Sequence, residues 1–98
     1  MNPPPYLLRF TREAAAVLSD LTKDERKLYK VRRALGRLET NPRHPGLNSH
    51  PYRSLHGIGG ETVWDSYIEN HTPSAWRIFW HYGPEPRTIT VVAIGPHP

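Results

Sequence analysis

Residues 75–82 read Ala-Trp-Arg-Ile-Phe-Trp-His-Tyr, and this stretch decides how the chain is expected to fold. Successive side chains of a β-strand point to opposite faces of its sheet. One face of a strand at this position carries only large apolar side chains, namely Trp76, Ile78 and Trp80. The opposite face carries Arg77, Phe79 and His81. We therefore expect the first set to lie in a core beneath other elements and Arg77 to lie on an open face of the sheet.

Segments on both sides of this stretch predict further strands. Short runs rich in aromatic and β-branched residues occur at 6–10, 52–55, 63–69 and 88–94. Turn-forming sequences separate the later ones at 57–60, 70–73 and 83–86. The glycines of 57–60 are not followed by a helical pattern, so they do not form a nucleotide-binding fingerprint. The second half of the chain is therefore expected to be a strand meander.

Two helices are expected between the first strand and this meander. Apolar residues recur at helical spacing in two sets, which are Ala14, Val17, Leu18 and Leu21, and then Leu28, Val31, Leu35 and Leu38. Thr11 suits the N-cap of the first helix. Thr22 to Glu25 has the form of a capping box for the second, and Asn41-Pro42 ends that helix.

The order of elements defines the fold class. Each helix has one apolar stripe, so both helices must pack on one face of the sheet and leave the other face open. The sequence therefore predicts an α+β fold, with the N-terminal strand and a two-helix hairpin on a mostly antiparallel sheet. Its 98 residues, 37% of them hydrophobic, are expected to form a single domain over 1–98.

Composition narrows the chemistry. The absence of cysteine excludes a disulfide framework, a thiolate metal site and a thiol nucleophile. His44, His50 and His56 do not have the spacing of a recognised zinc site, so we expect no metal and no cofactor. The start of the chain lacks the pattern of a signal peptide, and no apolar run could span a bilayer. We expect a cytoplasmic protein with no membrane partner.

Positive charge is concentrated in the first half of the chain. The formal net charge is +4, and nine of the thirteen lysines and arginines lie between Arg9 and Arg37. Such an uneven balance suggests nucleic acid or an acidic protein as a partner. Four basic residues share one face of the second predicted helix, namely Arg26, Lys30, Arg33 and Arg37. This face could follow a phosphate backbone, and an ordinary solvated helix face is the alternative.

Four segments of the meander, in their order and spacing, resemble the RelE/ParE superfamily of small toxins. They are Tyr-Arg-Ser-Leu at 52–55, Trp-Asp-Ser-Tyr at 64–67, Trp-Arg-Ile-Phe-Trp at 76–80 and Ile-Thr-Val-Val-Ala-Ile-Gly at 89–95. The resemblance, which covers nearly the whole chain, implies an endoribonuclease that cleaves messenger RNA on the ribosome without metal. A ParE-like inhibitor of DNA gyrase is one alternative, and a non-catalytic protein-binding module of the same fold is another. Toxins of both branches are normally held inactive by a cognate antitoxin protein.

The resemblance also implies site residues. YoeB-like ribonucleases place a Glu, a Lys, an Arg and a late His around the open sheet face, and these positions correspond here to His50, Arg53, Arg77 and His97. Two features depart from the family pattern. Pro98 stands where a Tyr follows the late His, and no Lys occurs after Lys30, so the Lys-rich site of RelE is absent.

These residue types suit RNA cleavage by internal transfer. A pair of histidines can take the proton of the 2′-hydroxyl and give one to the leaving 5′-oxygen. Arg77 can stabilise the charge on phosphorus, and Arg53 can add a second clamp. Tyr67 and His81 are further candidates for RNA contact, Tyr67 by stacking on a base.

Arg77 also has a purely structural interpretation, because it could pair with Asp65 or Glu69 across strands. In its functional role it would lie on the open face and contribute little to the core. The Arg77→Ala variant would then lose cleavage and keep its fold.

Overall fold

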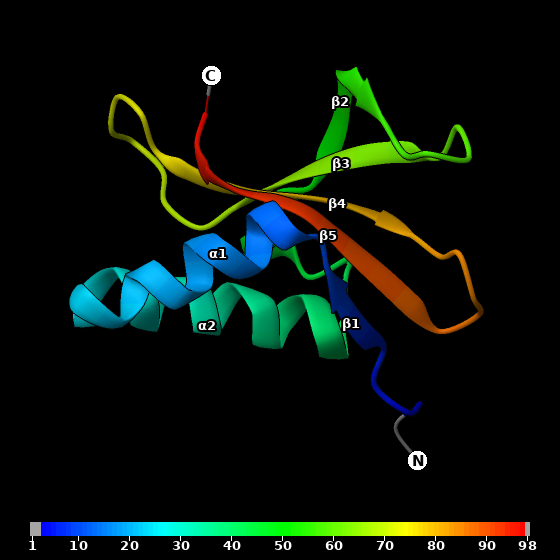
Figure 1. Cartoon of the computed structure of the whole chain (residues 1–98), viewed down its shortest axis with the longest axis horizontal. Helices are drawn as coiled ribbons and strands as arrows, with labels where there is room; N and C mark the ends of the chain where they lie inside the picture. Colours follow the sequence, from blue (N-terminus) through cyan, green and yellow to red (C-terminus); the bar gives the residue numbers. More distant parts are fainter. Residues whose placement is uncertain (1–2, 98) are drawn as a thin grey trace.

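The computed structural model describes residues 3–97 and contains one five-stranded sheet with two α-helices (Figure 1). The elements in chain order are β1 (Leu7–Phe10), α1 (Arg12–Asp20), the 3-10 turn η1 (Leu21–Lys23), α2 (Glu25–Thr40), the 3-10 turn η2 (Pro45–Leu47), β2 (His50–His56), β3 (Thr62–Tyr67), β4 (Trp76–Tyr82) and β5 (Thr88–Pro96). The strand order in the sheet is β1-β5-β4-β3-β2. Only the β1–β5 pair is parallel among the described strands. The predicted α+β class and mostly antiparallel sheet are confirmed.

Both helices lie against the same face of the sheet, and the C-terminal end of β5 rises on the other side (Figure 1). The core under the helices is made of fully buried apolar side chains, among them Val31, Leu38, Ile78, Trp80, Ile89 and Val91. Trp76 packs against this core from its edge. Phe79 faces away from it and contacts the Tyr52 ring, with ring centroids 4.9 Å apart. The alternation expected along β4 is therefore confirmed.

One helix start is confirmed and the other differs from the prediction. The Thr11 hydroxyl accepts a hydrogen bond from the backbone N–H of Ala14 and donates one to the carbonyl of Val92. The predicted capping box of α2 is wrong, because the N-cap is Asp24, whose carboxylate accepts from the N–H of Lys27. Thr22 instead donates to the carbonyl of Ser19, since the chain continues from α1 into η1. Within residues 3–97, neither helix is long and apolar enough to cross a membrane.

Two strands are longer than predicted, and both extensions concern candidate site residues. β2 begins at His50, which lies opposite Asp65 of β3 and not in a loop. β5 runs to Pro96, and the backbone N–H of His97 then donates to the carbonyl of Ala75 at 2.9 Å. His50 thus belongs to the sheet, and the backbone of His97 is hydrogen-bonded to the residue just before β4.

Candidate functional site

A buried carboxylate stands at the centre of the candidate site. Asp65 of β3 is fully buried, and its Oδ1 accepts a hydrogen bond from Nη1 of Arg77 at 3.2 Å. Nε2 of His50 lies 3.5 Å from Oδ2 of Asp65, and Nε2 of His97 lies 3.4 Å from the same oxygen. We call these four residues the Asp65 cluster. It joins side chains from β2, β3, β4 and the segment after β5.

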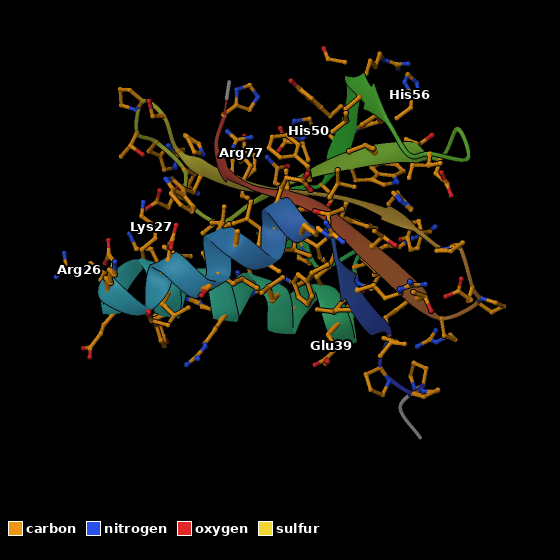
Figure 2. All side chains as sticks on the ribbon, viewed as in Figure 1. Arg26, Lys27, Glu39, His50, His56 and Arg77 are labelled. Atoms are coloured by element: carbon orange, nitrogen blue, oxygen red, sulfur yellow. The ribbon has the colours of Figure 1, made fainter. Side chains whose placement is uncertain are left out.

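The strand register explains why these residues meet. His50 lies opposite Asp65, and Arg77 lies opposite Tyr67, which is two residues beyond Asp65 on the same face of β3. The intervening Ser66 points to the helix face, where its hydroxyl accepts a hydrogen bond from Nε1 of Trp80. Figure 2 shows Arg77 and His50 on the side of the sheet away from the helices.

Arg77 is held by its charge and by an aromatic ring. Its Cζ atom lies 3.8 Å from the centroid of the Tyr67 ring, and its side chain is 13% exposed. Within residues 3–97, Nε of Arg77 is buried and has no hydrogen-bond partner. The pairing with Asp65 changes the expectation for Arg77→Ala. That variant would leave a buried carboxylate without its guanidinium, which destabilises a fold by roughly 3–5 kcal/mol.

The two histidines are oriented by further contacts. His50 donates from Nδ1 to the carbonyl of Asn48 at 3.0 Å, since a carbonyl can only accept. Its ring meets that of Tyr67 edge to face, with centroids 6.2 Å apart. The ring of His97 meets that of Tyr52 in the same way at 6.4 Å. Both imidazoles remain about half-exposed, at 45% and 41%, so a ligand can reach them.

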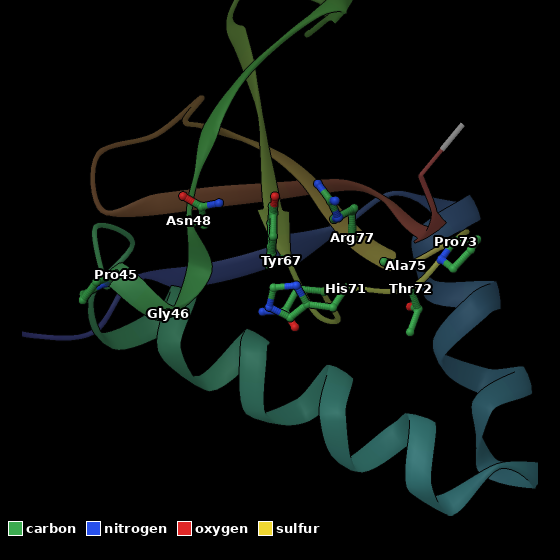
Figure 3. Close-up of a pocket in the computed structure, with 10 residues that line it drawn as sticks. Pro45, Gly46, Asn48, Tyr67, His71, Thr72, Pro73, Ala75 and Arg77 are labelled. Carbon is green, nitrogen blue, oxygen red and sulfur yellow. The ribbon is translucent and has the colours of Figure 1, made fainter.

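A cavity of about 560 Å³ opens beside Arg77, which we call the Arg77 cavity (Figure 3). Its wall includes Tyr67, Arg77 and Asn48, together with the turn between β3 and β4 that carries His71. The volume is within the range of small-ligand sites. A phosphodiester entering it would meet Arg77, whereas His50 and His97 do not line the cavity.

Arg53 and His81, both predicted from the sequence, lie outside the cluster. Arg53 is exposed on β2, and within residues 3–97 its side chain forms no hydrogen bond or ion pair. His81 is only 6% exposed, and its Nδ1 bonds to the carbonyl of Tyr82 toward the far end of β4.

The basic face of α2 is divided. Lys30 forms an ion pair with Glu69 at 3.1 Å, and together with Arg33 and Arg37 it lines a smaller cavity. Arg26 is exposed in the first turn of α2, far from Arg77 (Figure 2).

From the sequence, Asp65 was predicted only as a possible partner of Arg77, whereas in the structure it is the centre of the site. Its signal was an acidic residue inside an aromatic strand pattern, where Asp is disfavoured. Tyr52 was not predicted as a site residue either. Its ring contacts those of Phe79 and His97 on the open face of the sheet. Among residues 3–97, no group of three or more His, Asp or Glu side chains is arranged to hold a metal ion.

Comparison with known proteins gives structural matches only. No family model and no curated protein sequence matches the chain. Among solved structures, a YoeB/ParE toxin from Agrobacterium tumefaciens superposes with a TM-score of 0.70 at 15% identity, covering 94% of this chain and 99% of that one. The archaeal RelE of the RelE–RelB complex from Pyrococcus horikoshii OT3 gives 0.66 at 13% identity, covering 93% of both chains. A chain of the intact E. coli RelBE toxin–antitoxin complex gives 0.63 at 16% identity, covering 95% and 98%.

These matches extend over almost the full length of each chain. The protein therefore has the RelE/ParE-like toxin fold, and the resemblance expected from the sequence is confirmed at the level of the fold. Identities this low do not carry over an activity, because one fold supports different functions.

Proposed function

We propose that the chain is a toxin-type endoribonuclease that cleaves ribosome-bound messenger RNA and is neutralised by a cognate antitoxin. The observation that supports it most is the convergence of Arg77, His50 and His97 on one buried carboxylate beside a cavity. Acid–base groups and a fixed cation are what internal transfer of a phosphodiester requires.

In this mechanism the 2′-oxygen attacks phosphorus, and the bond to the 5′-oxygen breaks. His50 accepts the proton of the 2′-hydroxyl, and His97 donates a proton to the departing 5′-oxygen. Arg77 stabilises the additional negative charge on the phosphoryl oxygens. The products are a 2′,3′-cyclic phosphate and a 5′-hydroxyl end, and no metal ion takes part.

Substrate must rearrange part of the cluster. Both ring nitrogens of His50 face acceptors, Nδ1 the carbonyl of Asn48 and Nε2 the carboxylate of Asp65. To act as a base, His50 has to give up one of these two contacts so that the nitrogen can accept the proton of the 2′-hydroxyl. Catalytic hydrogen bonds commonly reach their working geometry only when substrate is bound. Asp65 acts as a positioning residue in this scheme, because its carboxylate orients the imidazole of His97 as well as Arg77.

The remaining predicted contacts belong to RNA binding. Tyr67 lines the Arg77 cavity and would contact a nucleotide there. Arg53, which is exposed on β2, would contact RNA farther along the sheet, whereas the buried His81 is not accessible to RNA without a rearrangement. The basic residues of α2, which are Arg26, Lys30, Arg33 and Arg37, would approach the phosphate backbone.

An antitoxin partner is part of the same proposal. Two of the similar structures are complexes, one of RelE with RelB and one the intact RelBE toxin–antitoxin complex. The chain exposes apolar side chains that a partner would cover, with Ile58 fully exposed and Phe10 37% exposed at one cavity of about 560 Å³. The positive charge of the chain favours an acidic partner segment. Co-expression with the product of the adjacent gene should relieve toxicity and yield a co-purifying complex.

The decisive assay compares wild type and Arg77→Ala on programmed ribosomes, with cleavage read by primer extension. Loss of the arginine should lower the rate by roughly 10²–10³-fold. Because the single variant also destabilises the fold, the double variant Arg77→Ala/Asp65→Asn is measured as well, and it should cleave more slowly than Asp65→Asn alone.

The end group of the wild-type product should be a 2′,3′-cyclic phosphate. If wild type is toxic but cuts nothing, and the double variant remains equally toxic, the ribonuclease proposal fails. A gyrase-type or other binding mechanism would then take its place.

A further inference from the structure

A second cavity adjoins the Arg77 cavity. It has a volume of about 150 Å³ and lies between α2 and the end of β3, with Lys30, Arg33 and Arg37 along the helix side. Gly46, Tyr67 and Asn70 line both cavities. The two hollows therefore adjoin along these residues, and together they extend from Arg77 to the middle of α2. We call its second part the α2 groove.

The charge in the α2 groove is unbalanced. Its one acidic residue among those described, Glu69, accepts hydrogen bonds from Nζ of Lys27 at 3.0 Å and of Lys30 at 3.1 Å. Burial raises the pKa of Glu69, but these hydrogen bonds outweigh burial and lower it, so the carboxylate stays charged and paired. Within residues 3–97, neither Arg33 nor Arg37 forms an ion pair. Two guanidinium groups thus remain to attract an anion.

The position of Arg37 depends on a glycine. A Cβ atom placed on Gly46 would lie 2.6 Å from Nη1 of Arg37 and 3.0 Å from its Cζ. The guanidinium therefore rests directly on the backbone of η2, at the point where the two cavities join. Any larger residue at 46 would push the end of Arg37 aside.

We propose that the α2 groove binds the phosphates of the RNA strand that flanks the scissile bond. The strand would run from Arg77 past Tyr67 and Asn70 to Arg33 and Arg37. This proposal rests on the proposed function and adds a defined track to it. Phosphate contacts from arginine position a nucleic acid without reading its sequence, and a ring and an amide between them can contact bases. Arg33 and Arg37 therefore matter only for RNA long enough to extend from one cavity to the other.

The first test measures binding of 2′-O-methyl RNA, which cannot undergo internal transfer, by fluorescence anisotropy. Oligonucleotides of two and of eight nucleotides are compared. Arg33→Ala/Arg37→Ala should weaken binding of the eight-nucleotide RNA on the order of tenfold. It should also reduce the slope of log affinity against log salt by about 1 per arginine. Binding of the two-nucleotide RNA should be unchanged.

The matched control is Arg12→Ala/Arg32→Ala, which removes the same charge from exposed positions elsewhere. Arg32 lines a different hollow, together with Leu28 and Tyr29. The control should retain affinity to within about twofold, as expected when only the distant field of the protein changes. If both double variants weaken binding equally, net charge alone is responsible and the groove is refuted.

A second pair of variants moves Arg37 without changing the charge. Gly46→Ala forces the end of Arg37 to shift, whereas Gly36→Ala on α2 places its Cβ in open space. Gly46→Ala should weaken binding of the longer RNA and Gly36→Ala should not. Equal affinity of these two variants would contradict the placement of Arg37 in the groove.

The outcome for the groove is separate from that for the ribonuclease. Cleavage by wild type with unchanged binding by Arg33→Ala/Arg37→Ala would refute the groove and keep the enzyme. Length-dependent loss of binding in a protein that never cleaves RNA would keep the groove and refute the enzyme.

Discussion

Both faces of β4 are largely buried, but they are held by different forces. Toward the helices, Ile78 and Trp80 are 0% and 1% exposed beneath α1 and α2. Away from them, Phe79 is 5% exposed and Arg77 13% exposed, although no helix covers that face. Apolar packing, which has no preferred direction, holds the first face. Ion pairs and ring contacts hold the second, so residues adjacent in the chain should have separable effects on stability and activity.

The faces also differ in how completely their polar atoms are paired. On the helix side, Nε1 of Trp80 donates to Ser66 at 2.7 Å, and Ser66 is 2.6 Å from the hydroxyl of Ser49. On the open side, Nε of Arg77 is buried without a partner in the described chain. An unpaired buried donor costs about 1–3 kcal/mol, and a catalytic role is one of the explanations for such a group in a folded protein. The open face is therefore where we expect stability to be given up for chemistry.

The largest expected effect on the open face comes from His97→Ala. Removal of a general acid should slow cleavage by roughly 10²–10⁴-fold. Because the imidazole is 41% exposed, the midpoint of thermal unfolding should change little. Single-turnover cleavage on programmed ribosomes measures the first quantity, and circular dichroism the second. His56→Ala, at the outer end of β2, is the control and should cleave normally.

The next largest effect should be on the opposite face, one residue from Arg77. Ile78→Ala should lower the free energy of unfolding by roughly 2–5 kcal/mol, because Ile78 is fully buried in the core. Denaturant titration gives this value. Cleavage per folded molecule should remain near wild type. A large loss of activity in the fully folded variant would show that the two faces are coupled.

The sequence was sufficient for the covered face and insufficient for the open one. Alternation at 75–82 placed Ile78 and Trp80 in the core because the periodicity of apolar residues along a strand indicates its buried face. The Asp65 cluster depends instead on register between strands far apart in sequence, such as His50 opposite Asp65. Register follows from the packed sheet as a whole, so neither the length of β2 nor the central position of Asp65 could be read from local pattern. The α2 N-cap failed for a related reason, because η1 displaced it to Asp24.

A smaller effect is expected from Asp65→Asn, which keeps the size of the side chain and removes its charge. The variant no longer fixes the imidazole of His97, and misplacement of a catalytic group costs up to about 10²-fold. We expect kcat to fall on the order of 10- to 100-fold while KM changes little, since Asp65 is fully buried and does not reach RNA. Steady-state kinetics separates the two. A rise in KM with unchanged kcat would contradict the positioning role.

The smallest effect concerns Glu69, which links the helix layer to the sheet. Its carboxylate accepts from Lys27 and Lys30 of α2 and from the backbone N–H of Trp76 at the start of β4. Burial raises the pKa of Glu69, but the three donors together outweigh burial, so the pKa lies below its ordinary value of 4.5. A carboxylate with a lowered folded pKa stabilises the fold above its unfolded pKa, and that contribution is lost as pH falls through the folded value.

Glu69→Gln should therefore reduce stability by about 1 kcal/mol at pH 7, and the difference from wild type should shrink below about pH 4.5. Thermal unfolding across this pH range measures it, with the exposed Glu39→Gln as a control that should change stability by less than about 0.5 kcal/mol. A difference that persists undiminished at low pH would mean that the shape of Glu69, and not its charge, joins the two layers.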